Sequence, residues 1–183
     1  MPGTLSCFRS IPSWLLRFGA LGWVACGGQM GPEESETIAG GLVAPVTVSF
    51  QDGVSPSASY AGTQDTTLVE ETPAQTYGSD GAIRTDGDSP AESRRDVSGL
   101  VRWDLSAIPS GSTVQSASLT FNVNNPAGGS YGLYALGRAW SEAEAQWTSA
   151  SIGAPWEVAG ARGPGDRDGR ALGTVTEAST RWC

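Results

Sequence analysis

The sequence of 183 residues contains no histidine and no lysine. The absence of histidine removes the usual general base of serine and cysteine hydrolases and the imidazole ligands of most catalytic zinc sites. Serine–lysine chemistry is excluded as well, because the chain has no lysine. We therefore expect a protein that is not an enzyme and that needs no cofactor.

Positive charge is also scarce. All 11 basic residues are arginines, they stand against 19 acidic residues, and the formal net charge is -8. Phosphate backbones are bound by basic surfaces, so nucleic acid is a poor candidate partner. Charged residues make up only 16% of the chain, whereas Gly (25) and Pro (11) are frequent. This composition favours a turn-rich all-β protein over a helical one.

Cysteine is rare, and its three positions leave the body of the chain without an internal pair. Cys7 and Cys26 lie near the N-terminus and Cys183 is the last residue. We therefore expect no disulfide inside the folded part, whose stability has to come from packing.

A long hydrophobic run is missing too. The apolar stretch Phe18 to Ala25 follows Arg9 and Arg17 and is too short to span a bilayer. Basic residues followed by a short apolar segment and small residues are typical of a secretory signal. We therefore predict a signal peptide over residues 1–26 and a secreted or cell-envelope protein.

The end of this leader, LGWVACGG (21–28), resembles a bacterial lipoprotein box, with Trp23 where that motif usually has Leu. The resemblance implies that Cys26 becomes a lipidated N-terminus, which would be the chain's only membrane contact. A cleaved signal with a bystander cysteine is the alternative. Residues 27–45 are Gly-rich and acidic and predict a flexible tether, and residues 46–183 are predicted to fold.

Short β-type runs recur between turn signals from Val46 onward. They are VTVSF (46–50), DTTLVE (65–70), AIRT (82–85), LVRWDL (100–105), VQSASLTFNV (114–123), YGLYAL (131–136) and ALGTVT (171–176). SEAEAQW (141–147) can form one helical turn and is too short to change the class. The pattern predicts an all-β fold, a β-sandwich or jelly roll.

Alternation assigns faces to two of these strands. One side of each is apolar: Val101, Trp103 and Leu105 in the first, and Ala117, Leu119, Phe121 and Val123 in the second. Residues two apart share a face of a strand, so we expect these sides to lie on the core. Arg102 and Asp104 are then predicted to point to solvent.

The order of several motifs resembles the DNRLRE-type module, carbohydrate-binding module family 96. The motifs are FQDGVSP (50–56), TYGSDGAIRTDGD (76–88), LVRWDLSAIPSGSTVQSASLTFNV (100–123), YALGRAWSEAEAQWT (134–148), GAPWEVAGARGPGDRD (153–168) and LGTVT (172–176). Trp103 replaces the usual Phe, and Gln146-Trp147-Thr148 replaces Thr-Trp-Asn. The resemblance implies a jelly-roll-like β-sandwich that binds polysaccharide, with uronate-rich polymers among its ligands.

Modules of this type continue with further strands, whereas this chain stops at EASTRWC (177–183). We therefore expect a module that lacks its last strands. Two other interpretations stay open. The chain is the N-terminal part of a larger secreted hydrolase, since similar modules are fused to lyases or metallophosphoesterases, or it is a structural or adhesive surface module without a sugar ligand.

Aromatic and basic residues are the candidates for sugar contact. We interpret Trp140, Trp147 and Trp156 as core and Tyr77 as a turn anchor rather than as sugar platforms. The predicted carbohydrate-binding residues are Arg84, Arg94, Arg95 and Arg102. Guanidinium groups pair with carboxylates such as those of uronates. The alternative is that they pair with acidic neighbours, namely Asp86, Asp88, Asp96 or Asp104.

Two acidic turns are weak calcium candidates. GDRDGR (165–170), with Asp166 and Asp168, and TDGDSP (85–90) each place two aspartates two residues apart in a Gly turn. Calcium needs six or more oxygen ligands, and neither turn has the EF-hand spacing. An acidic turn without metal is therefore the default interpretation.

Overall fold

The structure is a computed structural model that describes residues 3–5, 45–125 and 129–176. Contacts divide the chain into one unit made of Met1–Ser10 and Ser49–Cys183 and a second unit, Ile11–Val48. Apart from Gly3–Leu5 and the exposed Pro45, the predicted leader and tether, with Cys26, lie outside the described residues. The account below concerns the first unit.

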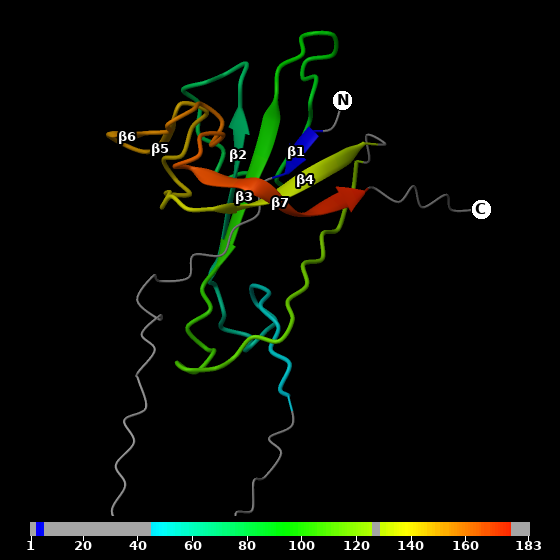
Figure 1. Ribbon diagram of the computed structural model, residues 1–183, viewed down its shortest axis with the longest axis vertical. Coiled ribbons are helices and arrows are strands. Elements are labelled where there is room, and N and C mark those ends of the chain that lie inside the picture. The colour runs from blue at the N-terminus through cyan, green and yellow to red at the C-terminus, as the bar shows by residue number, and fades with distance from the viewer. Residues whose placement is uncertain (1–2, 6–44, 126–128, 177–183) are drawn as a thin grey trace, which may run out of the picture. The chain divides into compact units, whose positions relative to one another are not determined.

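The described part of the chain is all-β and contains no helix, which confirms the predicted class. Its strands are β1 (Gly3–Leu5), β2 (Thr63–Val69), β3 (Val97–Trp103), β4 (Ser130–Leu136), β5 (Ser149–Ser151), β6 (Ala154–Pro155) and β7 (Arg167–Thr176). They form three small sheets, in the orders β1-β4-β7, β2-β3 and β5-β6 (Figure 1). All pairs are antiparallel except β1 with β4. The described residues contain no helix that is long and apolar enough to cross a membrane.

The β2–β3 ribbon is held by an unbroken ladder that runs from Thr63 opposite Trp103 to Val69 opposite Val97. β-branched and aromatic residues suit a pleated surface, which explains why TQDTTLV and the following VSGLVRW form strands. Both faces are buried from the middle of the ribbon to its Val69–Val97 end, whereas the Thr63–Trp103 end is half-buried. The predictions for 65–70 and 100–105 are therefore confirmed in position, with boundaries shifted by a few residues.

The main core lies on the face of the ribbon that carries Leu68 and Leu100, both 0% exposed. They pack with three buried tryptophans and other side chains from 136–161, so the core comprises Leu68, Leu100, Leu136, Trp140, Ala145, Trp147, Ala150, Trp156 and Ala161. Arg102 shares this face with Leu100, because the two are two residues apart in one strand. The prediction that Arg102 points to solvent is therefore wrong.

Val101, which we expected on the core side, is also buried but lies outside this cluster. Trp103 is half-buried, and Leu105 follows the end of β3. Both faces of the ribbon are thus covered. Alternation identifies two sides of a strand, but it cannot tell which one the rest of the chain packs against more tightly.

Three predicted strands do not form. Residues 46–50 and 114–123 have no ladder partner among the described residues, and 82–85 is joined to the ribbon through the Arg84 amide and the Thr67 hydroxyl (3.1 Å). Leu119 and Val123 are 45% and 44% exposed, so the predicted core face of 114–123 is not in the core. A ladder needs a partner strand, which no local pattern supplies.

The later strands agree better with the sequence. Residues 131–136 lie within β4 and 171–176 within β7, as predicted. The segment 141–147 contains one turn, in which the Ser141 carbonyl accepts hydrogen bonds from the Glu144 (3.2 Å) and Ala145 (2.8 Å) amides. This single turn was also predicted.

Candidate functional site

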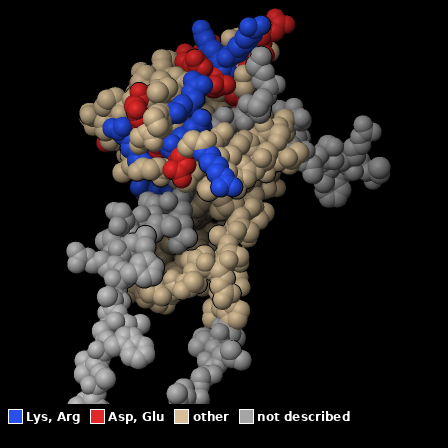
Figure 2. Space-filling view, viewed as in Figure 1, with Lys and Arg blue, Asp and Glu red and all other residues tan. Residues whose placement is uncertain are grey.

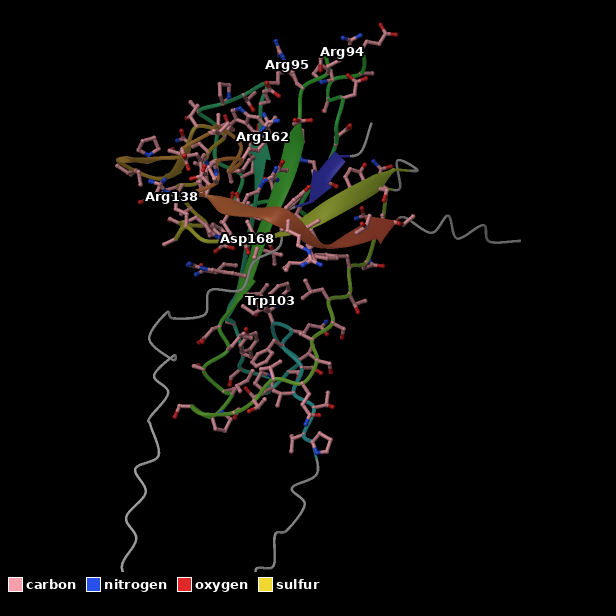
Figure 3. All side chains as sticks on the ribbon, viewed as in Figure 1. Arg94, Arg95, Trp103, Arg138, Arg162 and Asp168 are labelled. Carbon is pink, nitrogen blue, oxygen red and sulfur yellow. The ribbon has the colours of Figure 1, made fainter. Side chains whose placement is uncertain are left out.

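Two of the four candidate arginines lie at one end of the β2–β3 ribbon. Arg94 and Arg95 precede β3 and lie at the opposite end of the ribbon from Trp103 (Figure 3). Arg95 pairs with Glu71 across 3.6 Å, and both side chains are about half exposed. The Arg94 side chain is exposed and makes no ion pair with any described residue.

The loop that carries Arg94 is organised by Asp88. Its carboxylate accepts hydrogen bonds from the amides of Glu92 (2.8 Å) and Arg94 (2.5 Å), two residues with positive φ angles of 68° and 58°. These bonds, from Arg94 first and then Glu92, lower the pKa of Asp88. Asp86 accepts the Asp88 amide (2.9 Å). Both aspartates of TDGDSP therefore bind the loop itself.

Arg84 lies beside the middle of the ribbon, because its amide bonds the Thr67 hydroxyl, opposite Gly99. Its guanidinium stands over the Tyr77 ring, 5.0 Å from the centroid. Asp80 is 3.9 Å away, at the limit for an ion pair, and the Arg84 side chain is 55% exposed. This guanidinium is therefore open to solvent and only weakly paired.

Arg102 is half-buried at the far end of β3. Its guanidinium donates two hydrogen bonds to the side-chain oxygen of Gln64, its cross-strand neighbour, and lies 5.1 Å from the Trp140 ring centroid. A guanidinium over an indole face is a stabilising cation–π contact. Arg102 therefore closes the end of the core.

The four candidate arginines do not form one site. Arg95 precedes β3 and Arg102 lies near its other end, so the two are about 23 Å apart at the usual strand rise of about 3.3 Å per residue. The alternative of local pairing fits Arg84, Arg95 and Arg102, but with Asp80, Glu71 and Gln64 as partners in place of the predicted aspartates. In Figure 2 the arginine side chains are interspersed with acidic ones and form no continuous basic patch.

The three tryptophans of the motifs belong to the core, as predicted. Trp140, Trp147 and Trp156 are only 5%, 4% and 5% exposed. Tyr77 holds its turn through a 2.6 Å hydrogen bond between its hydroxyl and that of Thr72, and through its carbonyl, which accepts the Asp80 amide. Its interpretation as a turn anchor is therefore consistent with the structure.

Asp166 is fully buried, and each of its oxygens accepts two hydrogen bonds. Oδ1 accepts them from the Glu157 amide (3.0 Å) and the Arg138 guanidinium (3.2 Å), and Oδ2 from the amides of Val158 (3.1 Å) and Gly163 (3.1 Å). Burial alone would raise the pKa of Asp166, but the three amides and Arg138 outweigh it and lower that pKa. The carboxylate is the anchor of the loop between Trp156 and β7.

This geometry does not assemble a calcium site. Both oxygens of Asp166 are already engaged, and Asp168 is exposed on β7. Among residues 45–125 and 129–176, no three or more His, Cys, Asp or Glu side chains are grouped to hold a metal ion. A cation at Asp166 would have to replace hydrogen bonds that hold the loop.

Arg162 is a structural residue that sequence reasoning missed. It donates to Asp96 Oδ2 (2.6 Å) and to the Ala159 carbonyl (3.2 Å), and its guanidinium lies 4.8 Å from the Trp147 ring centroid. It thereby ties the loop before β7 to the residue that precedes β3. The one feature of the sequence that could have indicated a structural role for Arg162 is its position between Gly160 and Gly163 in a turn-rich segment. No pattern near Arg162 predicts that its partner is Asp96, 66 residues away.

A shallow hollow lies next to Tyr77. It has a volume of about 180 Å³ and is lined by Thr76, Gly78, Ser79, Glu142 and Ala143. This volume is below the roughly 300–1,000 Å³ of most small-molecule sites. The hollow therefore suits the edge of a longer ligand better than an enclosed small molecule.

One residue that lines this hollow, Glu142, is acidic and is bonded to β2. The Asp65 amide donates to Glu142 Oε1 at 2.9 Å. Burial raises the pKa of the Asp65 carboxyl, and the neighbouring Glu142 and Asp52 raise it further. The charged residue that lines the hollow is therefore the acidic Glu142, and the guanidinium of Arg84 lies beside the hollow, over Tyr77.

No family model, curated protein or solved structure matches this chain. The resemblance to the DNRLRE-type module rests on the motifs of the sequence and stays a prediction.

Proposed function

We propose that the chain is an extracytoplasmic, non-catalytic polysaccharide-binding module with a jelly-roll-like β-sandwich fold. The all-β class, the order of the sequence motifs and the absence of histidine and lysine support this proposal. Cys26 is the proposed lipid attachment point, which would hold the module at the cell envelope. The tether of residues 27–45 then separates it from the membrane.

The observation that carries the proposal is the position of Arg84. Its exposed guanidinium stands over Tyr77, whose neighbours Thr76 and Gly78 line the open hollow. Its contact with Asp80, at 3.9 Å, is weak enough to yield to a better-placed carboxylate. A uronate unit would place its carboxylate on Arg84 and its hydroxyl groups towards Ser79 and Glu142.

Affinity gel electrophoresis tests this proposal with the full chain in gels that contain a polyuronate, such as alginate, or a neutral glucan. We expect the polyuronate to retard the protein and the neutral glucan to leave its mobility unchanged. Arg84→Ala removes a charge-assisted hydrogen bond worth about 1.5–3 kcal/mol. In the polyuronate gel, the retardation of this variant should therefore correspond to binding that is at least about tenfold weaker than that of the original chain.

Arg170→Ala is the matched control, because Arg170 is an exposed arginine on β7 and its loss changes the net charge equally. Binding that survives Arg170→Ala but not Arg84→Ala supports the site. Equal loss in both variants would show a general charge effect, and no retardation by any glycan of a folded sample would refute the module. A fall in polymer length during incubation would instead indicate catalysis.

A further inference from the structure

Four Asp-Gly pairs occur in the sequence, at residues 52–53, 80–81, 86–87 and 168–169. Such pairs can isomerise without an enzyme, because the glycine nitrogen can attack the carboxyl carbon of the aspartate side chain and glycine has no Cβ to hinder this. The reaction needs a carboxyl group and an amide that are free of hydrogen bonds, and a backbone that can rotate. The four pairs differ in how far the structure meets these requirements.

Two of the four pairs have a carboxylate that is already engaged. Asp52 Oδ1 accepts the Thr63 amide (3.0 Å), and the amide of the following glycine donates a hydrogen bond of 2.8 Å. Asp86 Oδ1 accepts the Asp88 amide (2.9 Å), the usual local bond of an aspartate in a turn. The main chain of Asp86 is also fixed, because its amide and carbonyl both bond to Val97, at 3.0 and 2.7 Å. Ring closure at either pair would have to break these bonds.

The third pair, Asp168 and Gly169, lies within a strand. It is exposed on β7, in a bulge between Arg167 and Ala171, which both pair with residues of β4. Ring closure requires rotation of the backbone at the aspartate. A strand that is fixed on both sides of the pair resists this rotation.

Asp80 and Gly81 meet all the requirements. The Asp80 side chain is 46% exposed, and among the described residues its carboxylate has one ion-pair partner, Arg84, at 3.9 Å. The Gly81 amide donates no hydrogen bond to any described residue. Apart from the neighbours of Gly81 in the chain, no atom lies within 4 Å of the position that a Cβ would take there. Neither residue belongs to a strand, so no ladder fixes this backbone.

We propose that Asp80–Gly81 is a modification site, at which the folded protein forms a succinimide and then isoaspartate. The Gly81 nitrogen forms a bond to the side-chain carboxyl carbon of Asp80, and the carboxyl hydroxyl leaves with the amide proton as water. Water then opens the ring at one of its two carbonyls. Opening at one restores aspartate, and opening at the other leaves isoaspartate, whose main chain runs through the former side chain. Water is the only other reactant.

The modification changes the surroundings of Arg84. Isoaspartate lengthens the main chain by one methylene group and displaces the carboxylate that faces the Arg84 guanidinium. The preceding residue, Ser79, lines the hollow beside Tyr77. These changes occur whether or not Arg84 binds a uronate, so the modification does not depend on the proposed function.

Peptide mapping of the full chain after prolonged incubation measures the reaction at each pair. Cleavage after Glu71 and Arg84 releases the fragment 72–84, which contains no other Asp-Gly pair. Mass spectrometry detects the succinimide as a loss of one water, and electron-transfer fragmentation distinguishes isoaspartate from aspartate. In the folded chain we expect isoaspartate to accumulate at residue 80 at least about fivefold faster than at the other three pairs, where bonds must first break. In urea, where these contacts are lost, the four rates should become similar.

Gly81→Ala tests the role of the free glycine. The added methyl group restricts the backbone and shields the attacking nitrogen, so the rate at residue 80 should fall at least about fivefold. Gly169→Ala is the matched control, because a Cβ at Gly169 also meets nothing within 4 Å. It should leave the rate at residue 80 unchanged. Near-UV circular dichroism, to which the buried tryptophans contribute, reports whether both variants keep the core.

Three results would overturn the proposal. The first is equal accumulation at all four pairs of the folded chain, and the second is faster accumulation at residue 168 than at residue 80. The third is an unchanged rate at residue 80 in folded Gly81→Ala. Accumulation at residue 80 that leads in the folded chain, and loses this lead in urea, supports it.

Discussion

At the scale of single residues, the side chain of Asp166 holds the loop between Trp156 and β7 in place. It is a buried carboxylate whose four hydrogen bonds come from three backbone amides and one arginine. Buried charges are tolerated only when they are fully paired in this way. The loop between Trp156 and β7 therefore depends on this carboxylate being ionised.

Asp166→Asn is expected to lower the free energy of unfolding by about 2–4 kcal/mol, because an amide nitrogen would then face a donor in the buried site. Urea denaturation followed by tryptophan fluorescence measures this loss. Asp168→Asn, at the exposed position two residues later, is the matched control and should change little. An unchanged stability of Asp166→Asn would show that the four bonds contribute nothing.

The pH dependence of stability follows from the same residue. The pKa of Asp166 is lower in the folded protein than its unfolded value of about 3.9. Its stabilisation is therefore complete above the unfolded pKa and is lost as the pH falls through the folded pKa. We expect the loss of stability towards acid pH to be shallower in Asp166→Asn, and an identical slope would contradict this assignment. Asp65, whose pKa is raised, acts in the opposite direction.

At the scale of elements, the chain uses arginines to join segments that are far apart in sequence. Arg162 joins the loop before β7 to Asp96, and Arg102 closes the core at the end of β3 over Trp140. These contacts explain why a chain without lysine keeps half-buried arginines: the planar guanidinium stacks on a ring while it donates hydrogen bonds. They also explain why Arg102 is a poor candidate for ligand contact.

The turn of residues 76–79 packs directly against Glu142. An alanine Cβ at Gly78 would overlap the Glu142 carbonyl oxygen, whereas nothing lies within 4 Å of a Cβ at Gly81. We expect Gly78→Ala to cost about 1–3 kcal/mol of stability through overpacking and Gly81→Ala less than about 0.5 kcal/mol. Thermal denaturation of the two variants decides this, and equal melting temperatures would mean that the turn is not in close contact with Glu142.

At the scale of the whole molecule, charge is unevenly distributed along the chain. The net charge is -8, yet the stretch between Asp104 and Arg138 carries none of it. The proposed uronate site relies on an ion pair between Arg84 and a carboxylate of the ligand. Salt therefore acts on this site both through that ion pair and through the general repulsion between the acidic chain and an acidic polymer.

Raising the ionic strength from about 0.1 M to 1 M shortens the Debye length from about 10 Å to 3 Å. We expect the difference in polyuronate affinity between the original chain and Arg84→Ala to shrink, because the ion pair at Arg84 is screened, whereas the general repulsion between the acidic chain and the polyuronate is screened in both proteins. Affinity electrophoresis of both proteins at the two salt concentrations measures this difference. A difference that does not shrink with salt would show that Arg84 contributes no ion pair to binding.

The sequence by itself determined the properties that depend on a few neighbouring residues or on the sum of all residues. It predicted the all-β class, the strands within 65–70, 131–136 and 171–176, and the burial of the three motif tryptophans, because propensity, turn residues and side-chain size act within a few residues. It also set the charge and the absence of histidine and lysine.

Tertiary structure decided what depends on partners distant in sequence. The alternation of apolar and polar residues predicted a strand at both 114–123 and 100–105. Among the described residues, only the second segment pairs with another strand, β2. Tertiary structure also decided that Arg102 lies over the Trp140 ring and that Asp166 accepts four hydrogen bonds. A hydrogen bond between residues far apart in sequence depends on how the whole chain packs, and no short stretch of sequence contains that information.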